Sequence, residues 1–138
     1  MRMSLIALLA VGAFVASTRT AAASNAVIVI PFEKHWVGPG HYVGTACDGG
    51  SIDMQLSNSS VTGDVQHFTA TVQVALPGRS LTAVLDGSFN FSTGKTVLNG
   101  AVVDGWLAGA RVHEEGRLVG FDPLTFVGTV QLMPSSAD

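Results

Sequence analysis

The sequence has few charged residues and a single cysteine. Asp, Glu, Lys and Arg make up 12% of the 138 residues, and the formal net charge is −3. No basic cluster is present that could neutralise phosphates, so nucleic acid is not an expected partner. Cys47 has no second thiol in the chain to pair with, which excludes an internal disulfide framework. The hydrophobic share of 47% excludes a disordered, solvating chain.

The sequence also lacks the short motifs that mark common active sites and metal sites. It contains no G-x-S-x-G nucleophile motif, no phosphate-binding loop and no dinucleotide fingerprint. Its four histidines and its cysteine form no H-x-x-x-H, C-x-x-C or H-x-H pattern. We therefore predict no catalytic residue, no metal site and no cofactor, and a non-enzymatic protein is favoured.

The first residues have the pattern of an export signal. Arg2 supplies the positive charge, residues 5–16 form an apolar core, and the small residues at 21–23 suit a signal peptidase. The apolar run is too short to span a bilayer. We expect a signal-peptide helix over residues 1–23, cleaved after Ala23, with a site near Ser17 as the competitor. The mature chain, residues 24–138, is then a single secreted or periplasmic domain without a membrane span.

The clearest hydrophobic periodicity lies in residues 66–76. Phe68, Val72 and Val74 alternate with polar residues such as Thr69 and Thr71, which predicts a half-buried strand. Residues 77–80 predict a four-residue turn. Two strands of this length form a long twisted hairpin that tends to close or stack. The apolar positions of the returning strand are Leu81, Ala83, Leu85, Phe89 and Phe91.

Asp104-Gly105 is the strongest two-residue hairpin signal in the sequence. A tight turn there would pair Val103 with Trp106. On the returning strand, positions 106, 108, 110 and 112 would then point inward, and Glu114 would end this apolar column. A carboxylate at that place could bind the polar group of a ligand or act as a base.

Turn residues divide the rest of the chain into short strands, with a loop expected over residues 58–64. Pro31 is expected to place the strand at 26–30 at an edge or to end it. Short links favour an up-and-down topology. We predict an all-β fold, an antiparallel barrel of about eight strands, with a two-sheet β-sandwich as the alternative. The barrel is favoured because its corners need glycines inside strands, here Gly87, Gly100, Gly109 and Gly128.

Residues 36–42 carry a resemblance to known barrels. They read W-x-G-x-G-x-Y, from Trp36 to Tyr42. This pattern resembles the opening strand of nitrobindin-like and related small haem or fatty-acid barrels, and more distantly the G-x-W opening of lipocalins. The resemblance implies a barrel. It does not extend to haem, because a histidine ligand would be expected near the C-terminus and none follows Gly116.

The interior of such a barrel is the candidate binding site. Large aromatic residues and many small alanines at inward positions leave room for a small apolar molecule, or equally pack as a solid core. The leading hypothesis is an exported, non-enzymatic barrel of unknown role that binds a small apolar ligand. The candidate ligand-binding residues are Trp36, Tyr42, Phe89, Phe91, Trp106 and Glu114.

Two alternative functions remain open. One is an acid–base enzyme, a cyclase- or isomerase-like barrel that uses His113 and Glu114. The other is an envelope or interaction protein that acts through an exposed strand edge at residues 27–30. The sequence does not indicate the oligomeric state.

Overall fold

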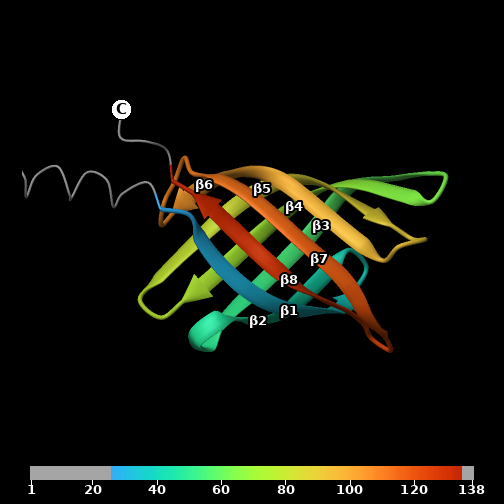
Figure 1. The fold of residues 1–138 in the computed structure, drawn as a ribbon, viewed down its shortest axis with the longest axis horizontal. Coiled ribbons are helices and arrows are strands. Elements are labelled where there is room, and N and C mark those ends of the chain that lie inside the picture. The colour runs from blue at the N-terminus through green and yellow to red at the C-terminus, as the bar shows by residue number, and fades with distance from the viewer. Residues whose placement is uncertain (1–25, 135–138) are drawn as a thin grey trace, which may run out of the picture.

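The computed structural model describes residues 26–134, which form a closed barrel of eight antiparallel strands (Figure 1). Each strand pairs with its neighbours in the sequence, and β1 pairs with β8 to close the barrel. The predicted barrel is confirmed, and the sandwich is excluded because the sheet is continuous. The expected signal helix at residues 1–23 lies outside the described residues. The strands are β1 (Ile28–Gly38), β2 (His41–Ala46), β3 (Gly50–Thr62), β4 (Val65–Leu76), β5 (Arg79–Asn90), β6 (Lys95–Gly105), β7 (Arg111–Phe121) and β8 (Leu124–Met133).

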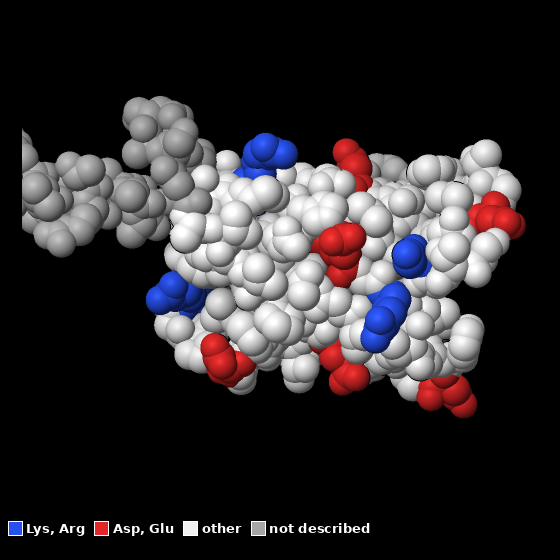
Figure 2. Space-filling view, in the orientation of Figure 1, with Lys and Arg blue, Asp and Glu red and all other residues white. Residues whose placement is uncertain are grey.

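Alternation along the strands sends most large apolar side chains inward, although others, such as Val29, Val84 and Val103, are exposed on the outer face. In β4, Phe68, Val72 and Val74 are buried, as the sequence predicted, while Thr71 and Gln73 are exposed. Each fully buried side chain of this size stabilises the fold by about 1.5–3 kcal/mol relative to exposure. On the outer face shown in Figure 2, charged side chains are scattered singly over a mostly uncharged surface.

The β3–β4 and β4–β5 hairpins are longer, and their turns are tighter, than the sequence indicated. Leu76 pairs directly with Arg79, so the turn between β4 and β5 has two residues rather than four. The loop expected over residues 58–64 is also wrong, because β3 continues to Thr62 with an irregularity between Ser57 and Ser60. The bulge, with Asn58 at a φ of 52°, keeps the two strands paired through this polar segment.

The turn between β6 and β7 differs from the predicted Asp104-Gly105 hairpin. Residues 106–109 all lie in the turn, and Ala101 pairs with Arg111. The predicted pairing of Val103 with Trp106 is therefore wrong, and Val103 points outward. The inward parity of β7 is confirmed, since Val112 and Glu114 are both buried.

Glycines allow the barrel wall to bend where strands cross closely. A Cβ atom on Gly128 would overlap the backbone carbonyl oxygen of Glu115, and one on Gly100 would overlap that of Val84. Both glycines lie inside strands, as expected for barrel corners. Gly109 does not, because it lies in the β6–β7 turn with a φ of 93°.

Pro31 lies within β1, not at its end. Residues 28–31 pair with β8, and pairing with β2 begins only at Phe32. The proline therefore lies where β1 has a strand partner on one side alone, which tolerates a missing N–H donor.

The two ends of the barrel differ. At one end lie the β2–β3, β4–β5 and β6–β7 connections. There Trp106 and Leu107 pack against the core, and the guanidinium of Arg79 lies 4.6 Å from the Trp106 ring centroid. The other end, which we call the pocket end, carries the β1–β2, β3–β4, β5–β6 and β7–β8 turns. In the described part of the chain, no helix is long and apolar enough to cross a membrane.

Candidate functional site

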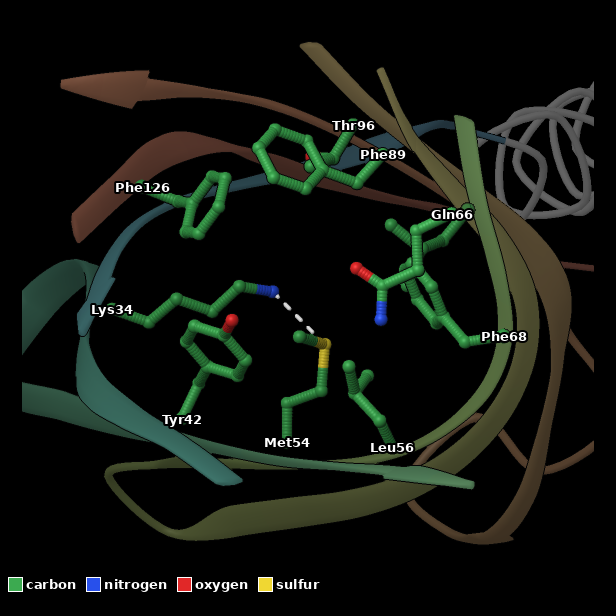
Figure 3. Close-up of a pocket in the computed structure, with 10 residues that line it drawn as sticks. Lys34, Tyr42, Met54, Leu56, Gln66, Phe68, Phe89, Thr96 and Phe126 are labelled. Carbon is green, nitrogen blue, oxygen red and sulfur yellow. Dashed lines mark hydrogen bonds between the residues drawn. The ribbon is translucent and has the colours of Figure 1, made fainter. Parts of the chain in front are cut away.

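A pocket opens into the barrel interior at the pocket end (Figure 3). Its walls are mainly aromatic and aliphatic, and the side chains of Lys34, Tyr42 and Gln66 point into it. An apolar cavity with a few converging polar groups is the usual form of a small-molecule site. The lining residues are Lys34, Tyr42, Met54, Leu56, Gln66, Phe68, Phe89, Thr96, Leu98 and Phe126.

A chain of aromatic rings crosses the mouth of this pocket. Tyr42 from β2 packs edge-to-face on Phe126 from β8, with ring centroids 5.7 Å apart. Phe126 in turn packs on Phe89 from β5 at 5.3 Å, and Phe89 packs on Phe91 at 5.1 Å. Such edge-to-face pairs add about 0.5–1.5 kcal/mol each beyond the area they bury. These contacts hold three distant strands together around the opening.

Lys34, which lines the pocket, belongs to a buried ion pair. Lys34 on β1 is 2% exposed, and its Nζ atom donates a hydrogen bond to Oε2 of Glu114 on β7, which is fully buried. The same ammonium lies 3.2 Å from the sulfur of Met54 and 4.6 Å above the ring of Phe32. Burying a charge is costly unless it is paired, so the two residues depend on one another.

The second carboxylate oxygen of Glu114 is an unusual feature. Oε1 is buried, and among residues 26–134 it has no hydrogen-bond partner. Buried carboxylate oxygens are nearly always satisfied in proteins, because an unmet acceptor carries the full cost of its desolvation. Within the described residues, the ion pair therefore leaves Oε1 as a buried oxygen that could still accept a hydrogen bond.

Three further polar residues line the pocket. Burial raises the pKa of the Tyr42 hydroxyl above its usual value, so this group remains a neutral hydrogen-bond donor at ordinary pH. Thr96 on β6 is also among the lining residues and is buried. Gln66 lies at the outer side, where its amide nitrogen donates to Oγ of Ser59 at 2.8 Å.

The pocket is small. Its enclosed part measures about 20 Å³, which is room for a single water molecule. With its opening to solvent included, the hollow measures about 320 Å³, near the lower limit for small-molecule sites. The opposite half of the interior is filled by side chains that are at most 2% exposed, namely Ile30, Ile52, Val74, Val112 and Leu132.

The structure brings together some of the candidate residues from the sequence. Tyr42 and Phe89 line the pocket, and Phe91 contacts Phe89 at the mouth although it is half exposed. Glu114 lies inside the barrel, as its strand position indicated, and touches the pocket through Lys34.

Two candidates lie away from the pocket. Trp36 is at the rim, where it pairs across the hairpin with Tyr42 and is 42% exposed. Trp106 helps to close the opposite end of the barrel. Neither residue is among those that line the pocket.

His113 does not share a site with Glu114. Its Nδ1 atom lies 2.7 Å from Oδ1 of Asn99, and its Nε2 atom lies 3.5 Å from the carboxylate of Glu115, both on the outer side of the wall. Glu114 points to the inside, because neighbouring residues of a strand face opposite ways. The two residues proposed for acid–base chemistry are thus separated by the barrel wall.

Sequence reasoning missed Lys34, which is central to the site. The sequence nevertheless indicated that Lys34 points inward, because Ile30, Phe32 and Lys34 occupy every second position and therefore share one face of β1. Among the lining residues that were not singled out, Met54, Leu56 and Phe126 also follow the inward parity of their strands.

Within residues 26–134, no three His, Cys, Asp or Glu side chains lie close enough together to hold a metal ion. Cys47, in the short 3₁₀ turn η1 (Cys47–Gly49), is a free thiol that is partly exposed. No protein-family model, no curated protein and no solved structure matches this chain.

Proposed function

We propose that the protein is an exported, non-enzymatic barrel that binds a small, mainly apolar molecule at its pocket end. The observation that carries this proposal is an aromatic pocket whose lining includes the lysine of a buried lysine–glutamate pair. The rings of Phe68, Phe89 and Phe126 offer an apolar ligand a surface to pack on. The polar groups of the lining give the ligand a defined orientation.

Binding requires side chains at the mouth to move. The enclosed volume of about 20 Å³ admits one water molecule, so a larger ligand has to displace part of the wall. Tyr42, Gln66 and Phe89 are only partly buried and lie on the outer side of the pocket. Rotamer changes of such side chains are common on binding, whereas the barrel backbone stays in place.

The two alternative functions receive less support from the geometry. His113 and Glu114 face opposite sides of the wall and cannot act on one substrate. Residues 28–30 pair with β8 within the barrel. One edge of this segment is therefore occupied, and at most the other edge is available to pair with a partner's strand. In the pocket, by contrast, polar and apolar groups converge on one space.

Titration with an uncharged fluorophore such as N-phenyl-1-naphthylamine tests the proposal, together with native mass spectrometry after gentle purification. Leu56→Trp places a bulky ring in the pocket, and Gln55→Trp places the same ring on the adjacent, outward-facing position of β3. We expect saturable binding in the parent and in Q55W, and its loss in L56W. Equal binding by both variants, or none by the parent, would refute a ligand site here.

Export is the second part of the proposal, and it rests on the N-terminal sequence alone. Expression of residues 1–138 in a bacterium should deliver the protein to the periplasm or the medium with Ser24 as its first residue. N-terminal sequencing checks this. A cytoplasmic product that retains residues 1–23 would contradict it.

A further inference from the structure

Lys34 combines three properties that are rarely found in one lysine. It is 2% exposed, its amine is in contact with a pocket, and a buried carboxylate lies within hydrogen-bond distance of it. An ammonium group on the outer wall would serve ordinary surface solubility. A lysine amine inside an apolar pocket is instead placed as a nucleophile toward carbonyl compounds.

We infer that Lys34 binds apolar aldehydes covalently, as a protonated Schiff base with Glu114 as the counter-ion. This inference rests on the proposed function, because the pocket must first admit the apolar part of the molecule. It names the chemical class of the ligand, an aldehyde attached to a flat or short apolar group that fits among Leu56, Phe89 and Phe126.

The reaction needs no reagent beyond the aldehyde. Glu114 accepts a proton from the Lys34 ammonium, and the free amine attacks the carbonyl carbon to form a C–N bond. The attacking nitrogen gives up one proton and the carbonyl oxygen takes up one, which yields a neutral carbinolamine. The protonated Glu114 then donates its proton to the hydroxyl, the C–O bond breaks and water leaves, so that an iminium ion and an ionised Glu114 remain. One aldehyde and one ammonium thus give one iminium and one water, with no net release of a proton.

The buried charges favour this product. The iminium carries the same single positive charge as the ammonium it replaces, so the pairing with Glu114 is preserved. Oε1 of Glu114 is buried without a partner among the described residues, and it can accept a hydrogen bond from the carbinolamine hydroxyl or from the departing water. The unused acceptor thereby has a role in the step that makes and expels water.

The composition of the chain makes the inference unusually easy to test. Lys34 and Lys95 are its only lysines, and Lys95 is exposed. Accessibility alone would direct an aldehyde to Lys95 and to the terminal α-amine. Preferential reaction at the buried Lys34 would therefore be the opposite of what solvent exposure predicts. Lys95 serves as an internal control in every protein molecule.

The experiment treats the folded protein with limiting cinnamaldehyde and cyanoborohydride, which reduces the iminium to a stable secondary amine. Peptide mapping by mass spectrometry then compares the two lysines. We expect Lys34 to carry at least about tenfold more adduct than Lys95, since binding holds the aldehyde beside it. Leu56→Trp, which fills the pocket, should abolish the Lys34 adduct. Unfolding in urea before labelling should remove the preference for Lys34.

Cinnamyl alcohol, which has the same carbon skeleton and no carbonyl group, separates the two proposals. If the alcohol displaces the fluorophore but only Lys95 and the α-amine are labelled, covalent capture is refuted and reversible binding is retained. If Lys34 is labelled preferentially while the alcohol shows no saturable binding, covalent capture is supported, and tight binding of the apolar skeleton without the carbonyl group is refuted. If the alcohol does not bind and Lys34 stays unmodified, both proposals are overturned.

Discussion

Nζ of Lys34 and Oε2 of Glu114 form a hydrogen-bonded ion pair inside the barrel, although 80 positions separate the two residues in the chain. They belong to β1 and β7, which are not neighbours in the sheet, so the pair crosses the interior past β8. Each charge is tolerated in this place because the other is present. The pair therefore links the stability of the fold to the chemistry of the site.

The first prediction concerns this mutual dependence. Lys34→Met or Glu114→Met alone leaves one buried charge without its partner and should lower the free energy of unfolding by about 3–5 kcal/mol. The double variant removes both charges and should lose less than either single variant, because well-packed apolar residues can replace a buried pair at little cost. Guanidinium chloride unfolding of the three variants measures these differences.

A matched control for the ion-pair variants is Lys95→Met, which removes the exposed lysine. It should change the free energy of unfolding by no more than about 0.5 kcal/mol. If the double variant loses as much as the two single variants together, the residues do not depend on one another as argued.

The second prediction uses Tyr42, the single tyrosine of the chain. Burial raises the pKa of its hydroxyl, so its phenolate should appear at higher pH in the folded protein than in the urea-unfolded protein. Absorbance of the phenolate reports on this residue alone. A ligand in the pocket should increase the difference, because it removes more water from the hydroxyl.

The same shift has a consequence for stability. An acid whose pKa is higher in the folded state stabilises the fold as long as it stays protonated. This contribution is complete below the ordinary tyrosine pKa of about 10 and is lost as the pH rises through the folded-state pKa. Tyr42→Phe should remove this part of the alkaline destabilisation. Identical alkaline unfolding of Y42F and the parent protein would contradict the burial of the hydroxyl.

The barrel could be predicted from the sequence because its strongest signals are local. The alternation of residues 66–76 specifies β4 and its inner face without reference to any other strand. The β6–β7 register could not be predicted, since it is decided by contacts at the end of the barrel. The backbone N–H of Trp106 donates to the carbonyl oxygen of Ser80, and Leu107, with a φ of 61°, packs against the core. These tertiary contacts outweigh the preference of Asp104-Gly105 for a two-residue turn.

The site was predictable only in part. Tyr42 and Phe89 could be proposed because aromatic residues at inward positions commonly line cavities. The burial of Lys34 could not be established, because the parity of β1 alone would bury an unpaired charge. Its partner Glu114 reaches it only once β1 closes on β8 and brings β7 to the same side of the interior. Closure of the barrel by β1 and β8 brings together residues that are distant in the sequence, so no local sequence pattern predicts it.

The third prediction concerns the bend of the barrel wall at Gly128. Its Cβ position is occupied by the backbone of Glu115 and Gly116 on β7, neither of which can rotate away. Gly128→Ala should lower the free energy of unfolding by about 1–3 kcal/mol or more, as overpacking does. Gly38→Ala is the matched control, since nothing lies within 4 Å of its Cβ position. A Gly128→Ala variant as stable as Gly38→Ala would show that the strands do not approach each other as described.

The last prediction separates the two ends of the barrel. Trp106 is partly buried, packs against the core and lies beneath the guanidinium of Arg79, far along the strands from the pocket lining. Trp106→Ala should therefore cost roughly 2–3 kcal/mol of stability, somewhat less than a fully buried aromatic residue. It should leave fluorophore binding at the pocket end unchanged. Phe89→Ala should alter binding in addition to lowering stability, because its ring is part of the pocket wall. Thermal unfolding and fluorophore titration of both variants measure this contrast. If W106A lost binding while still folded, the ligand would have to enter from the end that Trp106 closes.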